Sequence, residues 1–127
     1  MSPGDADDVT SECFTLLAND RAPREARARV TAFDTLPPRV RVDACLVISE
    51  IITNSVRYGG LQLDDHIDVW LSLEGQHLVI EVDDHGSMVR ATYTTPRRPA
   101  GVGLTILGTV CDYWDAQAGH MTARIPL

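Results

Sequence analysis

The first half of the chain begins with apolar residues at helical spacing. In residues 22–36, Ala26, Val30 and Phe33 recur every three or four positions, and arginines occupy the other side. This pattern predicts an amphipathic helix. The proline pair at 37–38 would end it, because proline cannot continue the hydrogen bonding of a helix.

A second, stronger helical pattern covers residues 39–58 and ends at Gly59-Gly60, a typical helix stop. Its centre, ACLVISEIITNSV, is apolar on nearly all sides, which predicts a buried helix. The positions expected to form one stripe on it are Val42, Cys45, Leu46, Ser49, Ile52 and Val56.

Short segments with strand character precede and follow these helices. The apolar stretch 13–18 predicts a leading edge strand. Residues 65–73 and 77–83 alternate apolar and polar positions around the turn sequence EGQ, which predicts an antiparallel hairpin. Two further short strands, 113–118 and 121–126, surround a glycine and would form a second hairpin.

Residues 87–100 contain Pro96, Pro99, Arg97 and Arg98 and show no periodicity, and we expect a loop there. A helix over 104–111 would follow. The resulting order of elements predicts a two-layer α/β (α+β) sandwich, in which helices cover one face of a mainly antiparallel, mixed sheet. We expect a single domain over residues 1–127, with 1–10 as a disordered tail.

The charge, the absence of lysine and the length of the apolar runs each exclude or disfavour particular functions. The formal net charge of −7 disfavours direct nucleic-acid binding, which needs a clustered positive field. All eleven basic residues are arginines, so chemistries that need a lysine, such as a Walker A loop or a Schiff base, are excluded. No apolar run has membrane-spanning length, and we expect a cytoplasmic protein without a membrane anchor.

Neither the cysteines nor the histidines have metal-binding spacing. The three cysteines are far apart and form no C-x-x-C pair, so we expect reduced, buried thiols. The four histidines show no H-E-x-x-H pattern, and we expect surface positions and no zinc. These residues are Cys13, Cys45, Cys111, His66, His77, His85 and His120.

Glu50 and Asn54 are the most informative polar pair. Their i, i+4 spacing places both side chains on one face of the otherwise apolar second helix. A carboxylate in such a place is costly unless something pairs with it, so a functional ligand is one interpretation. The alternative is structural: Arg57 would pair with Glu50, and Asn54 would bond only to backbone.

Two glycine-containing motifs occur later in the chain. Asp84-His85-Gly86 follows a predicted strand, where a carboxylate could accept a hydrogen bond from an exocyclic amine. Gly101-Val102-Gly103 precedes a predicted helix, where backbone amides can face phosphate. Each motif alone also fits an ordinary turn or an ordinary loop-to-helix junction.

In combination, these motifs resemble those of the GHKL ATPases. SEIITNSVRYGG is similar to the N box of that superfamily, VDDHGS to the first glycine box, and GVGLTIL to the second. The similarity extends from about Pro23 to the end and is closest to the compact anti-sigma-factor serine/threonine kinases. It implies the Bergerat ATP-binding fold, with residues 87–100 as an ATP lid.

The resemblance also implies roles for individual residues. Glu50 would be the catalytic base, Asn54 would hold Mg²⁺ against the ATP phosphates, and Asp84 would recognise the adenine amino group. The remaining nucleotide-binding positions would be Arg57, Gly86, Gly101, Gly103 and Leu104. The sequence departs from the pattern after Gly86, where a second glycine is missing, and at Val102, where an arginine is frequent.

The implied function is phosphorylation of a serine or threonine on an anti-anti-sigma (STAS-type) partner, coupled to control of a sigma factor. A homodimer is left open. Two alternatives also remain. The chain could be a non-catalytic module that binds ATP or no nucleotide, which the eroded glycine boxes favour. It could also be the ATPase part of a split histidine kinase, although no helix with a phospho-acceptor histidine is apparent.

Overall fold

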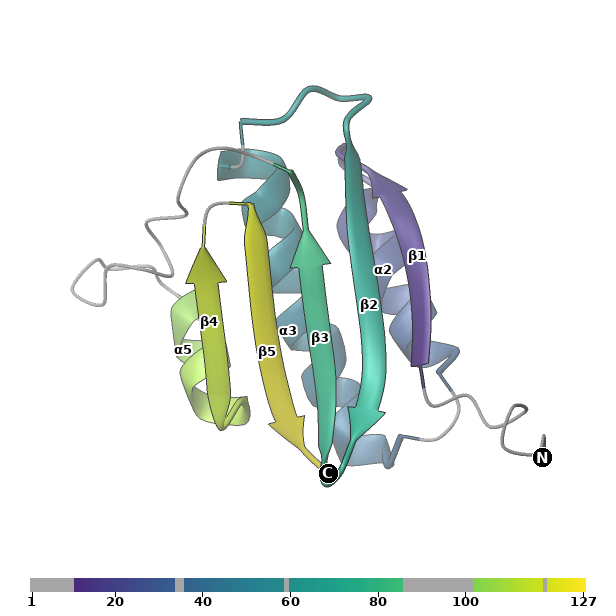
Figure 1. Ribbon diagram of the computed structural model, residues 1–127, viewed down its shortest axis with the longest axis vertical. Coiled ribbons are helices and arrows are strands. Elements are labelled where there is room, and N and C mark those ends of the chain that lie inside the picture. Colours follow the sequence, from purple (N-terminus) through teal and green to yellow (C-terminus); the bar gives the residue numbers. More distant parts are fainter. Residues whose placement is uncertain (1–10, 34–35, 59, 86–101, 118) are drawn as a thin grey trace.

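A computed structural model describes residues 11–33, 36–58, 60–85, 102–117 and 119–127. In these residues, three helices pack on one face of a five-stranded sheet (Figure 1). The strands are β1 (Ser11–Leu17), β2 (His66–Glu74), β3 (His77–Asp83), β4 (Tyr113–Gln117) and β5 (His120–Pro126). The helices are α2 (Ala22–Thr31), α3 (Pro38–Tyr58) and α5 (Val102–Val110).

The sheet has the order β1-β2-β3-β5-β4. Every pairing between the described strands is antiparallel, so the sheet contains no parallel component among these residues. The predicted two-layer α+β fold is therefore confirmed. The sheet was expected to be mainly antiparallel and mixed, and in this part of the chain it is fully antiparallel. Antiparallel strands of this kind can leave one face to solvent.

The hairpin between β2 and β3 follows directly from its turn. Glu74 pairs with His77, which leaves Gly75 and Gln76 as a two-residue turn. Gly75 has a φ of 62°, a left-handed conformation that such turns require and that glycine adopts without strain. The turn fixes the register of the whole hairpin, so that Asp68 lies opposite Asp83.

The core lies between the sheet and the helices. Alternate strand residues point toward the helices and are buried, as the two-residue period of a strand requires. The buried strand positions in this core are Phe14, Leu16, Ile67, Val69, Leu71, Leu78, Ile80, Val82, Met121, Ala123 and Ile125. Together with the buried side chains of the helices, these apolar residues remove the surface from water that drives folding.

The predicted helix over 22–36 is shorter in the structure. α2 ends at Thr31, and the N–H of Phe33 then donates to the carbonyl of Val30 in a tightened turn, at 3.1 Å. Phe33 and Leu36 are nevertheless buried. They enter the core from the connection after the helix, which is why the apolar spacing continued beyond its end.

The stripe predicted on α3 was partly wrong. Val42 and Leu46 are 61% and 46% exposed, and only Ile52 of the predicted set is fully buried. The residues that face the core are Val40, Ala44, Val47, Ile48, Ile51, Ile52 and Ser55. Because this helix is apolar on several sides, its sequence alone does not select the face that packs on the sheet.

The flank of α3 nearest to α2 is polar and half-buried. The guanidinium of Arg27 donates to the Ser49 hydroxyl at 2.9 Å, and the Thr31 hydroxyl lies 3.7 Å from the Cys45 sulfur.

All three cysteines are free, but Cys13 is exposed, which corrects the expectation of buried thiols. In the described part of the chain, no helix has the length and apolar character needed to cross a membrane.

Candidate functional site

Glu50 and Asn54 lie one turn apart on α3 and are joined by hydrogen bonds. The Asn54 Nδ2 donates to the Glu50 backbone carbonyl at 2.9 Å and to its carboxylate Oε2 at 3.2 Å. Asn54 is 4% exposed, and Glu50 is partly buried. The backbone contact was expected from the structural interpretation of the pair. The contact with the carboxylate shows in addition that the two side chains face one another.

This arrangement orients the amide of Asn54. Since Nδ2 donates to Glu50, the Oδ1 oxygen is the atom of this amide with the chemistry of a cation ligand. Carboxamide oxygens are among the hard donors that Mg²⁺ accepts. Arg57 lies in the last turn of α3 and is exposed, so its charge is at the helix end where a cation is favoured.

Asp84 directly follows β3 and is 1% exposed. Its position continues the alternation of Leu78, Ile80 and Val82, whose side chains face the helices. The Asp84 N–H donates to the carbonyl of Gly119 at 2.9 Å, which attaches this residue to the start of β5. A buried carboxylate held in this way is suited to accept a hydrogen bond from a ligand amine.

The elements that carry these residues meet at one end of the molecule. Figure 1 shows that the last turns of α3 and the end of β3 lie at the same end, and that α5 begins on the side facing that end. α3 also packs against both β3 and α5. The fold therefore brings the N-box helix, the strand leading to Asp84 and the glycine-led helix into one region.

Several predicted site residues fall in or near the undescribed segment. Gly86 and Gly101 lie outside the described residues, as does the predicted lid, 87–100. Gly103 and Leu104 lie in the first turn of α5, of which the structure describes the backbone path. Helix α5 starts two residues earlier than predicted, so Val102 and Gly103 are inside it.

His85 and Asp68 form a polar contact that the sequence analysis did not single out. The His85 Nε2 lies 2.8 Å from Asp68 Oδ2, and the backbone N–H of His85 donates to Asp83 Oδ1 at 2.9 Å. His85 has a φ of 61°, which is unusual for a residue with a side chain. The sequence indicated only part of this arrangement, because the EGQ turn places Asp68 opposite Asp83 but does not place the side chain of His85.

Electrostatics in this contact favour the charged pair. The hydrogen bond to Asp68 raises the pKa of His85 above its ordinary value of 6.5. In return, hydrogen bonds from His85 and from the Thr15 hydroxyl lower the pKa of Asp68 below 3.8. Each partner therefore stabilises the ionised form of the other.

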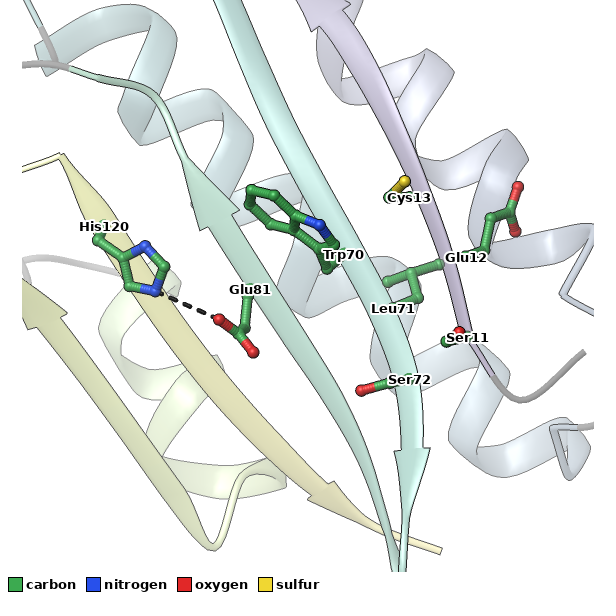
Figure 2. A pocket seen from close by; sticks show the side chains of 8 residues that line it. All are labelled: Ser11, Glu12, Cys13, Trp70, Leu71, Ser72, Glu81 and His120. Atoms are coloured by element: carbon green, nitrogen blue, oxygen red, sulfur yellow. Dashed lines mark ion pairs between the residues drawn. The ribbon is translucent and has the colours of Figure 1, made fainter.

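The hollows formed by the described residues include two on or beside the open face of the sheet. One, of about 540 Å³, is lined by Thr15, Leu61, Asp65, His66, Asp68, Asp84 and His85. Figure 2 shows the other, where Trp70, Cys13 and Ser72 lie beside an ion pair of 3.4 Å between His120 and Glu81. The hollow in Figure 2 contains none of the predicted site residues, and only the first one reaches Asp84.

Comparison with known proteins identifies the family. The model of the histidine kinase-like ATPase domain matches residues 16–124. The chain belongs to that family. A crystal structure of the RsbU and RsbW domains of Rv1364c from Mycobacterium tuberculosis has a similar fold, with a TM-score of 0.61 and 20% sequence identity. No curated protein matches the chain significantly.

The similarity to the mycobacterial protein covers 91% of this chain and 31% of the other. At this identity it establishes the fold of the ATPase domain and does not transfer an activity. The family predicted from the N box and the two glycine boxes is confirmed by the family match.

In the described residues, no group of three or more His, Cys, Asp or Glu side chains is arranged to hold a metal ion.

Proposed function

We propose that this ATPase domain is a regulatory serine/threonine protein kinase of the anti-sigma-factor type. It would transfer the γ-phosphoryl group of ATP to a hydroxyl of an anti-anti-sigma protein and thereby control a sigma factor. The observation that carries the proposal is the hydrogen-bonded pair of Glu50 and Asn54 on α3, inside the family match. Protein kinases use a carboxylate to orient the attacking hydroxyl and a carboxamide as a ligand of Mg²⁺ in phosphoryl transfer.

Each residue has a role that its chemistry supports. Glu50 orients the attacking hydroxyl and accepts its proton, as general bases do. The oxygen of Asn54 ligates Mg²⁺, and the buried carboxylate of Asp84 accepts a hydrogen bond from the adenine amino group. When bound, ATP would supply the γ-phosphoryl group, and Mg²⁺ would neutralise charge on the phosphates. Arg57 adds a phosphate contact at the exposed end of the same helix.

The geometry of these residues fits this ligand. The Asn54 amide is held by its nitrogen, which directs its oxygen as the donor to a hard cation. Asp84 is buried at the end of β3, and its backbone is held by Gly119, so a ligand amine would meet a preorganised acceptor. The glycines at 86, 101 and 103 complete the proposed phosphate and adenine contacts, as the family motif implies.

The principal experiment separates catalysis from binding. Glu50→Gln keeps an acceptor for the Asn54 amide but removes the base, so we expect phosphate transfer to fall about 100-fold or more while ATP affinity changes little. Transfer is measured with radiolabelled ATP and a purified STAS-domain protein of the same source. Glu25→Gln, at an exposed position on α2, is the matched control and should retain full transfer.

The outcome also decides between the kinase and a non-catalytic module, which the missing second glycine after Gly86 favours. If wild-type protein yielded no phosphoprotein, and sigma-factor regulation were equal in wild type and in Glu50→Gln, the kinase proposal would be wrong. Phosphate on a histidine of the partner would instead favour a split histidine kinase.

Calorimetry with Mg-ATP tests the binding half of the proposal. Asp84→Asn removes a charged acceptor, and we expect affinity to fall roughly 10- to 100-fold, since a hydrogen bond to a charged group contributes about 1.5–3 kcal/mol. Asn54→Ala should weaken Mg-ATP more than nucleotide without metal. Equal affinity of Asp84→Asn and wild type would contradict the adenine assignment.

A further inference from the structure

Two carboxylates oppose each other next to Asp84. Asp68 on β2 and Asp83 on β3 are direct cross-strand partners in the hairpin register. Their side chains lie on the open face, because the alternating neighbours Ile67, Val69 and Val82 are buried toward the helices. Like charges placed directly opposite one another destabilise a strand pair. Something must offset this repulsion at the end of β3.

The imidazole of His85 lies between these two carboxylates. Its Nε2 is 2.8 Å from Asp68 Oδ2, and its Nδ1 is 3.4 Å from Asp83 Oδ1. The N–H of the same residue donates to Asp83. The contacts therefore fix both the ring and the backbone of His85, whose left-handed φ costs energy unless its surroundings hold it.

The contact between His85 and Asp68 is part of a network that extends across three strands, β1, β2 and β3. The Thr15 hydroxyl on β1 donates to Asp68 Oδ1 at 2.8 Å, so Asp68 connects β1 to the segment after β3. On the other side of His85, Asp84 faces the helix layer and its N–H donates to Gly119 on the approach to β5. Asp84 is thus held between two attachments, one on each side of β3.

We propose that His85, clamped between Asp68 and Asp83, is a pH-sensitive positioning residue that holds the backbone of Asp84 in its nucleotide-binding orientation. This inference rests on the proposed ATP-binding function. Protonated His85 bridges the two carboxylates through a charge-assisted hydrogen bond to Asp68 and an ion pair with Asp83. Neutral His85 keeps one hydrogen bond at most and leaves the two negative charges opposed.

The direction of the pH effect follows from the neighbouring charges. Asp68, Asp83 and Asp84 all favour protonated His85, and its pKa lies above 6.5. The stabilisation is therefore fully present below pH 6.5 and is lost as pH rises through that higher pKa. The other charged groups near this contact are Asp65 and His66, before and in β2, and Glu81 and His120, which pair with each other.

The decisive measurement is ADP affinity as a function of pH. Between pH 6 and pH 9 we expect wild-type affinity to fall about threefold or more relative to the affinities of His85→Gln and Asp68→Asn. The double variant should resemble either single variant, because both remove the same contact. The matched control is His77→Gln, which breaks a comparable 2.6 Å pair with Asp112 at the start of β3.

The control also removes the titration of ADP itself from the comparison, since that contribution is common to all variants. Affinity of His85→Gln that varied with pH as in His77→Gln would overturn the proposal. So would a wild-type affinity that changed with pH no more than that of Asp68→Asn, because the clamp then has no influence on binding.

A second measurement needs no nucleotide. Amide hydrogen exchange at Asp84, corrected for the intrinsic effect of pH, should accelerate several-fold from pH 6 to pH 9 in wild type and His77→Gln. In His85→Gln it should be fast at both values. If none of the proteins bound ADP, the proposed function would fail. Exchange at Asp84 unaffected by His85→Gln would overturn the clamp itself.

Discussion

The two faces of the sheet differ in composition and in what they contribute. Leu71 and Trp70 are neighbours on β2, yet Leu71 is 1% exposed beneath the helices and Trp70 is 40% exposed on the open face. The covered face is apolar, whereas the open face carries histidines that pair with carboxylates, such as His120 with Glu81 and His85 with Asp68. The comparison indicates that one face supplies stability and the other supplies pH-dependent charge.

The largest expected effect is on the covered face. Leu71→Ala should lower the free energy of unfolding by about 2–5 kcal/mol, because it opens a cavity in the core. Trp70→Ala should lower it by about 1 kcal/mol or less, since much of this side chain is in water. Urea denaturation of both variants gives the comparison. Equal losses would mean that the open face contributes to the core as well.

Cysteine reactivity should separate the two environments next. Burial, with the charge of Asp112 as a smaller cause, raises the pKa of Cys111 to about 12. At pH 8 roughly one Cys111 in 10,000 is then a thiolate, which is the reactive form. Iodoacetamide should label exposed Cys13 about 100-fold faster or more, as followed by peptide mass spectrometry. A Cys13→Ser protein that took up label at the same rate as wild type would contradict this ordering.

The smallest effect concerns the open face as a source of pH-dependent stability. The pair of His85 and Asp68 should contribute less than about 1 kcal/mol, because both side chains are partly in solvent. Its contribution is present between pH 3.8, the ordinary pKa of Asp68, and pH 6.5, that of His85. The contribution is lost as pH falls through the lowered pKa of Asp68, and also as pH rises through the raised pKa of His85.

The test compares unfolding of wild type and His85→Gln in urea at pH 5.5 and pH 9. The difference in stability between the two proteins should be larger at pH 5.5. A difference that grew with pH would show that protonated His85 is unfavourable in the folded protein, and the sign of the proposed effect would be reversed.

Much of the fold could be predicted from local patterns. The strands on both sides of Gly75 were placed to within one residue, because alternation and turn chemistry are encoded in adjacent residues. The end of α2 was missed, since Phe33 is buried from outside the helix. The buried face of α3 was also missed, because Val42 and Leu46 are as apolar as the residues that face the sheet.

The candidate site was predicted in the same uneven way. The spacing of Glu50 and Asn54 correctly indicated side chains that meet, as their hydrogen bond shows. The roles assigned to them, and to Asp84, stay predictions. The contact of Asp68 with His85 was overlooked because it joins residues 17 positions apart, and the pattern of either segment taken singly does not contain it.

The sequence by itself determined the elements, the hairpin register and the family, because periodicity, turn residues and short motifs are properties of neighbouring positions. The tertiary structure decided which side of α3 is buried and which charges meet at the end of β3. Those outcomes depend on packing and on cross-strand contacts, whose energies arise only when distant segments are brought together.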